Sequence, residues 1–186
     1  MTDALIVVDV QNDFITGSLA VEGGNEVARA ISSFIDDEAH PYDFTVATQD
    51  WHIRPGEHFS DTPDYIDSWP PHCVAWSYGA MIHGALRIDQ FDENFLKGRY
   101  FAAYSGFEGS GLDSGDMLAT WLIDKGVRAV DVVGIATDYC VKATALDAVK
   151  MGFKTRVLAD LCAPVTAEGG AAALEEMAAA GVEIVR

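Results

Sequence analysis

Basic residues are scarce in this sequence, and their scarcity limits the partners of the protein. Lys and Arg together number 12 against 29 Asp and Glu, so the formal net charge is −17. A surface of this sign repels phosphate backbones and anionic membranes, which argues against nucleic acid and membranes as partners. A neutral small molecule fits better, although an acidic surface also simply keeps a protein soluble.

Long apolar runs and a cysteine framework are also missing. No apolar stretch approaches the roughly 18 residues that cross a bilayer, and the N-terminus lacks the basic flank and apolar run of a secretory signal. We therefore expect a cytoplasmic protein. The three cysteines, Cys73, Cys140 and Cys162, are unevenly spaced, which fits neither a disulfide framework nor a zinc ribbon. At least one free thiol thus requires an explanation.

The remainder of the chain has the composition of one α/β domain spanning residues 1–186. Apolar residues make up 49% of the sequence, enough to bury a core. Strand-like and helix-like patterns alternate, which predicts a three-layer fold: a mostly parallel central sheet with helices on both faces. The predicted strands are 4–10, 44–48, 129–133, 153–158 and 182–185, and the predicted helices are 25–35, 117–125, 138–151 and 167–180.

The region of about 50–95 interrupts this alternation. It is rich in Pro, Trp, His and Asp and shows no sustained period. A loop of this length is uncommon within a compact domain and is usually functional or disordered. Its aromatic and histidine side chains argue for order, so we interpret it as a loop that builds a site.

Residues capable of chemistry follow the predicted strands. Asp9 lies near the end of the first, Asp50 and His52 come just after the second, and Cys140 follows the strand that ends at Val133. Ligands of parallel sheets bind beyond the carboxyl ends of the strands. We therefore expect these side chains to converge on one edge of the sheet.

Cys140 stands between a buried strand and a helix, a position typical of a nucleophile. The unpaired N–H groups at the start of the helix favour a thiolate, and the N–H groups of Ala136 and Cys140 are the expected donors to an oxyanion. The alternative is a buried structural cysteine, the commoner fate of a free thiol. Cys73 and Cys162 lack this position and are expected to be inert.

A cysteine nucleophile needs a base, for which Asp9 is the candidate. A carboxylate among apolar residues at a strand end should be desolvated and have a raised pKa, so it could take the thiol proton and return it to departing ammonia. A structural ion pair is the alternative for Asp9. Lys97 could hold Asp9 and the thiolate in register, although most lysines only extend into water.

The loop also carries a candidate metal site, formed by Asp50, His52, His58 and His72. Asp50 and His52 are two residues apart, so an extended chain points both the same way, and the turn at Pro55 can bring His58 back toward them. Three imidazoles and a carboxylate suit iron, manganese or zinc better than calcium or magnesium. Solvent-exposed histidines remain the alternative.

Taken together, these motifs resemble the nicotinamidase (pyrazinamidase) branch of the isochorismatase-like cysteine hydrolases. The resemblance runs along the whole chain, through Val7-Val-Asp-Val-Gln-Asn-Asp-Phe14, the metal loop, Lys97-Gly-Arg-Tyr100 and Gly134-Ile-Ala-Thr-Asp-Tyr-Cys140. It implies that nicotinamide is converted to nicotinate and ammonia, and pyrazinamide to pyrazinoate, through a cysteine thioester. It also implies one divalent metal ion and a place in pyridine nucleotide salvage.

The resemblance further assigns roles to individual residues. It implies a triad of Asp9, Lys97 and Cys140, the metal ligands Asp50, His52, His58 and His72, and a cis peptide between Ile135 and Ala136 that directs the N–H groups of Ala136 and Cys140 into an oxyanion hole. Phe14 and Trp69 would sandwich the pyridine ring, with Tyr104, Ile135 and Tyr139 nearby. Tyr139 departs from the pattern, since relatives often carry His there.

Three other functions remain open. A related metal-free cysteine amidohydrolase would lack the loop ligands, an isochorismatase proper does not require the cysteine, and a non-catalytic ligand-binding protein of the same fold would not need the triad. The oligomeric state is expected to be a monomer or a small homo-oligomer.

Overall fold

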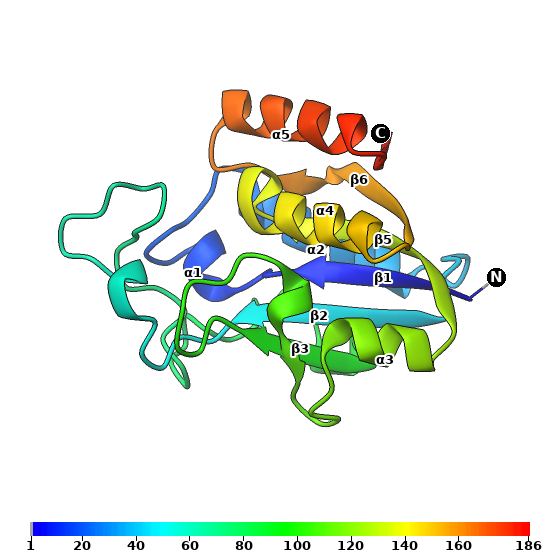
Figure 1. The fold of residues 1–186 in the computed structure, drawn as a ribbon, viewed down its shortest axis with the longest axis horizontal. Helices are drawn as coiled ribbons and strands as arrows, with labels where there is room; N and C mark the ends of the chain where they lie inside the picture. Colours follow the sequence, from blue (N-terminus) through cyan, green and yellow to red (C-terminus); the bar gives the residue numbers. More distant parts are fainter. Residues whose placement is uncertain (1) are drawn as a thin grey trace.

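The computed structural model describes residues 2–186 and contains one sheet of seven strands in the order β4-β3-β2-β1-β5-β6-β7 (Figure 1). Strand β4 pairs antiparallel with β3, and the other neighbouring strands are parallel. The mostly parallel sheet is therefore confirmed, and its continuity supports the single domain that we propose. The strands are β1 (Thr2–Val8), β2 (Phe44–Asp50), β3 (Glu93–Lys97), β4 (Ser110–Gly111), β5 (Val127–Ile135), β6 (Lys154–Ala163) and β7 (Glu183–Val185).

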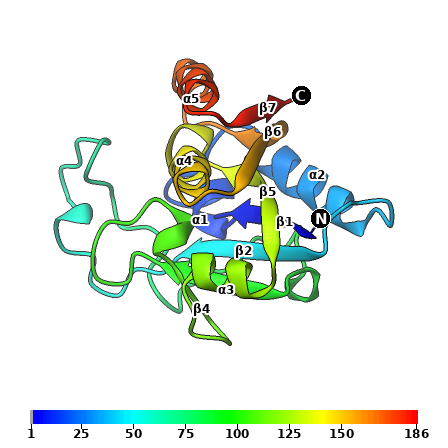
Figure 2. The same ribbon diagram turned by 45° about the vertical axis from the view of Figure 1, so that its right-hand side comes forward.

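Helices cover both faces of this sheet. Helix α2 packs on one face against β5 and β6, whereas α3, α4 and α5 lie on the other (Figures 1 and 2). No helix within residues 2–186 has both the length and the apolar character needed to span a membrane. The helices are α1 (Asn12–Ile15), α2 (Gly24–Asp36), α3 (Leu118–Asp124), α4 (Lys142–Lys150) and α5 (Ala167–Ala179), with short turns η1 (Gly56–His58), η2 (Ile88–Gln90), η3 (Gly106–Glu108) and the π-helical η4 (Thr137–Val141).

The central strand β1 shows why a nearly continuous apolar run forms this core. Its side chains alternate between the two faces, as they must in a strand. Ile6 and Val8 belong to the core beneath α3, α4 and α5, whereas Leu5 and Val7 belong to the core beneath α2. All four are at most 1% exposed, so β1 needs apolar residues at every position.

Strand β3 was missed because its sequence begins with polar residues inside the predicted loop. Glu93 and Asn94 are nevertheless buried. The carboxylate of Glu93 accepts hydrogen bonds from the N–H groups of Asn94, Asp113 and Ser114 at 2.9, 3.2 and 2.9 Å. Hydrogen bonds from Asp113 and Ser114 thus let the charged Glu93 lie inside the strand, and β3 carries Lys97 to the carboxyl edge of the sheet.

The segment between β5 and α4 also differs from its prediction. The helix predicted at 138–151 is divided into the π-helical turn η4 and α4. The peptide bond between Ile135 and Ala136 is cis, as the resemblance implied. Gly134, just before it, has φ +118° and pairs with Val8 of β1. An added Cβ at Gly134 would lie 2.2 Å from the carbonyl oxygen of Val8.

This contact predicts a large cost for Gly134→Ala. The added methyl group must displace the main chain of β1, and residue 134 must keep a backbone conformation that L residues avoid. We therefore expect the free energy of unfolding to fall by more than about 2 kcal/mol. Chemical denaturation measures the change. The matched control is Gly152→Ala, which also has a positive φ (+89°) but has open space around the added Cβ and should cost only about 1 kcal/mol. Equal losses in the two variants would contradict the steric explanation.

Candidate functional site

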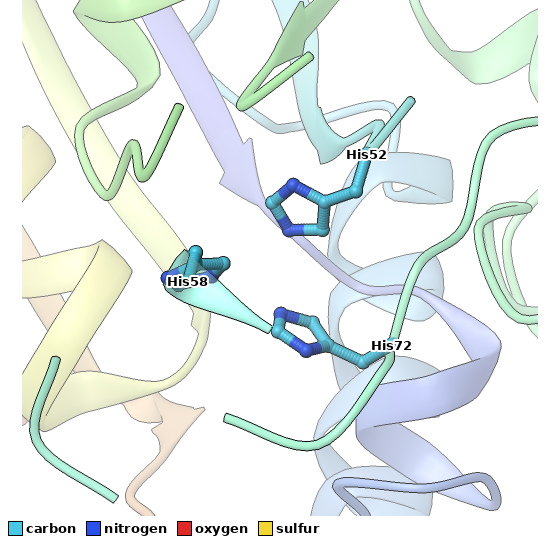
Figure 3. Close-up of side chains that lie close together, drawn as sticks. All are labelled: His52, His58 and His72. Atoms are coloured by element: carbon cyan, nitrogen blue, oxygen red, sulfur yellow. The ribbon is translucent and has the colours of Figure 1, made fainter. Parts of the chain in front are cut away.

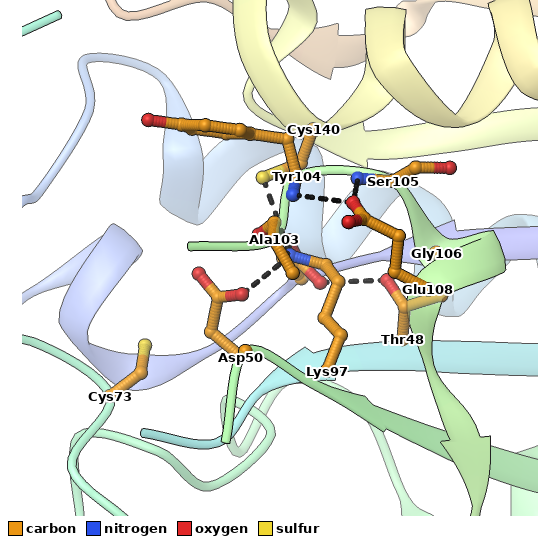
Figure 4. A network of polar contacts seen from close by, with 12 residues as sticks. Thr48, Asp50, Cys73, Lys97, Ala103, Tyr104, Ser105, Gly106, Glu108 and Cys140 are labelled. Atoms are coloured by element: carbon orange, nitrogen blue, oxygen red, sulfur yellow. Dashed lines mark hydrogen bonds and ion pairs between the residues drawn. The ribbon is translucent and has the colours of Figure 1, made fainter. Parts of the chain in front are cut away.

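The three residues of the predicted triad meet at the carboxyl edge of the sheet. Asp9 directly follows β1, Lys97 ends β3 and Cys140 lies in η4. The Nζ atom of Lys97 is 2.5 Å from Oδ1 of Asp50 and 3.6 Å from Sγ of Cys140 (Figure 4). It is also 2.9 Å from Oδ2 of Asp9. A carboxylate oxygen of Asp9 lies within 4.8 Å of the same Sγ. The convergence expected from the strand ends is therefore confirmed.

Burial and charge shift the pKa values of these groups in different directions. Burial raises the pKa of Asp9, and the nearby Lys97 only partly opposes this. Burial also disfavours the charged form of Lys97, but Asp50 and Asp9 outweigh it and raise the lysine pKa well above its usual value. Lys97 is therefore an ammonium group, and Asp9 has the raised pKa that the sequence predicted.

The sequence analysis expects Asp9 to take the proton of the Cys140 thiol, and the surroundings of Cys140 fit that expectation. Burial raises the pKa of the thiol well above its ordinary value, and the proximity of Lys97 does not compensate for it. The side chain of Cys140 is 7% exposed, and desolvation of this kind favours the neutral thiol. Cys140 therefore holds its proton until a base removes it, and Asp9 is close enough to be that base.

The four predicted metal-site residues also come together. His52, His58 and His72 each offer a ring nitrogen within 4.8 Å of those of the other two (Figure 3). Oδ2 of Asp50 lies 3.6 Å from Nε2 of His52 and 3.8 Å from Nε2 of His72. Asp50 thus directs one oxygen to Lys97 and the other to the histidines.

The local bonding fits a metal ion at this position. Nδ1 of His52 is 2.7 Å from the carbonyl of Gly98, and Nδ1 of His72 is 2.8 Å from that of Pro70. These contacts fix each ring so that Nε2 faces the cluster, as in metal-binding histidines. Nε2 of His52 is buried and has no hydrogen-bond partner. Burial lowers the pKa of His72 to about 4, so its ring is neutral near pH 7 and able to ligate.

A cavity of about 260 Å³ opens onto both groups of residues. This is below the usual range for drug-sized ligands, and it suits a single aromatic ring. All the residues predicted to contact substrate line it: Phe14, Trp69, Tyr104, Ile135, Ala136, Tyr139 and Cys140. Asp50, His58 and His72 line the same cavity. The sequence interpretation missed other parts of its wall, namely Ser18, Leu19, Ala20, Val21, Tyr65 and Val165.

The comparisons with known proteins agree with this geometry. The Isochorismatase domain matches residues 3–186. The chain belongs to the isochorismatase family.

Relatives within the isochorismatase family include proteins with named activities. A nicotinamidase/pyrazinamidase of Mycobacterium tuberculosis is 57% identical over 183 residues, covering 98% of this chain and 97% of that protein. The structure of PnC1 from L. infantum in complex with nicotinate has a TM-score of 0.86 and 37% identity, and covers 100% of this chain and 92% of that one. The pyrazinamidase of Pyrococcus horikoshii in complex with zinc has a TM-score of 0.83 and 36% identity, covering 100% and 99%.

One buried glutamine organises the isochorismatase-family site from behind, and the sequence interpretation overlooked it. Nε2 of Gln11 donates to the carbonyls of Asp50 and Ala80 at 2.8 and 2.7 Å, and its Oε1 accepts from the N–H of Asp50 at 2.8 Å. The amide thus holds both main-chain groups of Asp50. Two residues later, Asp13 accepts from the N–H of Cys73 at 2.7 Å, next to His72.

Two threonines support the triad in a similar way. Thr48 donates to Oδ1 of Asp9 at 2.7 Å, which leaves Oδ2 directed toward Lys97. Thr144 of α4 donates to the carbonyl of Cys140 at 2.7 Å and accepts from the N–H of Gly106 at 2.9 Å.

The signal that could have identified Gln11 and Asp13 was their place directly after a buried strand, where polar side chains need partners.

The Gln11 contacts predict a specific defect in Gln11→Met. The variant keeps the side-chain volume but removes all three hydrogen bonds, so the position of Asp50 is no longer fixed. We expect divalent metal affinity to fall by about 10–100-fold, measured by titration of the purified protein with zinc. The matched control is Gln49→Met. The side-chain amide of Gln49 donates to the same Ala80 carbonyl at 3.0 Å but makes no hydrogen bond to Asp50. Equal zinc affinities in the two variants would refute the role of Gln11.

Proposed function

We propose that this protein is a nicotinamidase that hydrolyses nicotinamide to nicotinate and ammonia, and pyrazinamide to pyrazinoate, through a thioester on Cys140. The observation that carries the proposal is the opening of the Cys140 thiol, beside Lys97 and Asp9, onto a cavity of about 260 Å³ with aromatic walls. The similarity to the nicotinamidase/pyrazinamidase of Mycobacterium tuberculosis supports the same reaction.

The first half of the reaction forms the thioester. Asp9 removes the proton from Sγ of Cys140 as the sulfur attacks the amide carbon. The ammonium of Lys97 stabilises the negative charge that develops on Sγ and remains paired with the carboxylate of Asp50. We assign the N–H groups of Ala136 and Cys140 to the developing oxyanion. As the tetrahedral intermediate collapses, the C–N bond breaks and Asp9 returns its proton to the leaving ammonia.

The second half consumes one water molecule. Asp9, again a carboxylate, takes a proton from the water molecule while the oxygen of that water attacks the thioester carbonyl. The C–S bond then breaks, the proton returns to Sγ of Cys140, and the carboxylic acid product loses its own proton to solvent. The enzyme ends in its starting protonation state, with a thiol at Cys140 and the carboxylate form of Asp9 paired with Lys97.

The aromatic residues explain why the substrate is a ring. Phe14 and Trp69 line the cavity and would hold the pyridine between them, with Tyr104, Ile135 and Tyr139 at its edges. The ring of Phe14 is 5.6 Å from that of His72, centre to centre, so a ring stacked on Phe14 also reaches the histidine cluster. This placement orders the amide before attack, which can contribute several kcal/mol to catalysis.

Asp50, His52, His58 and His72 would hold one divalent metal ion, for which iron, manganese and zinc are all compatible with the ligands. When bound, the ion would act as a Lewis acid toward the ring nitrogen, directly or through bound water, and would thereby orient the ring. The histidine cluster favours this assignment over a metal-free amidohydrolase of the family, and the intact triad favours it over a non-catalytic binding protein. A role in pyridine nucleotide salvage, a cytoplasmic location and a monomeric or small homo-oligomeric state stay predictions.

The thioester route predicts that Cys140→Ala abolishes ammonia release from nicotinamide, because no other nucleophile is paired with Asp9 and Lys97. We expect a loss of at least about a thousandfold in turnover, measured by a coupled ammonia assay. Cys162→Ala is the control, since Cys162 is also buried but donates to the carbonyl of Leu158 in β6 and should retain activity. Substantial turnover by Cys140→Ala would sink the proposal.

The metal assignment predicts that His72→Ala lowers both metal content and turnover. Loss of one of four ligands should weaken binding enough to remove most of the ion during dialysis, and we expect activity to fall by at least about a hundredfold. Metal content is measured by elemental analysis on the same sample as the ammonia assay. His83→Ala, in the same region of the chain but outside the histidine cluster, is the control. Unchanged metal content in His72→Ala would contradict the assignment.

A further inference from the structure

We propose that the hydroxyl group of Tyr139 latches an exposed loop over the substrate cavity and thereby sets the largest ring that the enzyme accepts. The inference rests on the proposed function, which supplies the substrate. We call residues 61–68 the strap. It projects from the carboxyl edge of the sheet, next to η1 (Figure 1), and Tyr65 of the strap forms part of the cavity wall.

The base of the strap connects the two halves of the site. The N–H of Ser60 donates to the carbonyl of Trp69 at 2.9 Å, and the N–H of Trp69 donates to the carbonyl of His58 at 2.8 Å. His58 belongs to the histidine cluster and Trp69 to the aromatic wall. The strap is therefore flanked by residues that we assign to the metal and the ring.

The tip of the strap is held together by its own contacts. Oδ1 of Asp64 accepts hydrogen bonds from the N–H groups of Ile66, Asp67 and Ser68 at 3.0, 3.0 and 2.9 Å. Tyr65 has a positive φ of +58°, a conformation that costs free energy in a non-glycine residue. The hydroxyl of Ser68 donates to the same oxygen at 2.9 Å, so opening the turn internally would break four hydrogen bonds to Oδ1 of Asp64.

Two tyrosines outside the strap attach this turn to the protein. The hydroxyl of Tyr139 donates to the carbonyl of Tyr65 at 3.3 Å, and that of Tyr104 donates to the carbonyl of Ile66 at 3.2 Å. Tyr104 also accepts from Nε1 of Trp69 at 3.1 Å. The side chains of Tyr65 and Ile66 are 55% and 67% exposed, and the ring of Tyr65 packs edge-on against Trp69 at 5.9 Å between centres. These hydrogen bonds and this one ring contact hold the tip in place.

Tyr139 thus connects the nucleophile to the strap. It immediately precedes Cys140 in η4, and its ring packs edge-on against Trp69 at 5.1 Å between centres. A ring substituent that requires more room must push the strap outward and break these hydrogen bonds. Binding of a ring-substituted substrate therefore includes the free-energy cost of opening the strap, whereas binding of unsubstituted nicotinamide does not. Tyr139 is, on this argument, a positioning residue for selectivity.

The test compares nicotinamide with nicotinamides that carry one methyl group on a ring carbon. For Tyr139→Phe we expect kcat/KM for at least one of the ring-methylated nicotinamides to rise about fivefold relative to nicotinamide, the effect of one lost hydrogen bond. Tyr104→Phe should change the ratio at least as much, because it removes a second contact to Trp69. Protease cleavage within residues 61–68, without substrate, should also accelerate.

Tyr78→Phe is the matched control, since its side chain is 76% exposed and outside the cavity wall; both readouts should match the unaltered enzyme. Unchanged substrate ratios and unchanged cleavage in Tyr139→Phe would overturn the latch. Failure of the unaltered enzyme to release ammonia from nicotinamide would instead overturn the proposed function. The protease cleavage rates of the Tyr139→Phe and unaltered proteins would still test whether the Tyr139 hydroxyl holds the strap.

Discussion

The ammonium group of Lys97 is enclosed by Asp9, Asp50 and Cys140, and it connects the two halves of the site. An isolated charge in such a place would cost several kcal/mol; here close partners offset that cost. The partners in turn depend on Lys97, since without it two buried carboxylates would face each other and the thiol. Asp50 divides its oxygens between Lys97 and the histidine cluster, so the position of the ammonium affects the nucleophile and the metal ligands together.

The loop around the site has little regular structure, and side-chain contacts to its main chain replace the missing ladders. Gln11 binds Asp50 as a neighbouring strand would, and Asp13 holds the main chain next to His72. These residues follow β1, which lies at the centre of the sheet and is buried on both faces. A rigid strand thereby fixes a segment that could not position three imidazoles by its own conformational preferences.

Strand and helix alternation was readable from the sequence because buried parallel strands are almost wholly apolar and a glycine follows each of the helices α3, α4 and α5. Gly126, Gly152 and Gly181 all have positive φ, between +75° and +99°, as caps require. Strand β3 was not readable, since the buried carboxylate of Glu93 accepts hydrogen bonds from Asp113 and Ser114, which are distant in the sequence. The π-helical start of the segment at Cys140 likewise has no periodic signature.

The sequence by itself determined which chemical groups are available and, through the strand order, that Asp9, Asp50 and Cys140 meet at one edge. It also identified the family, because several motifs occur in the right order along the whole chain. Only the tertiary structure decided the state of these groups. Burial raises the pKa of Cys140 and Lys97 opposes this only in part, and that balance depends on distances and burial that neighbouring residues in the sequence do not specify.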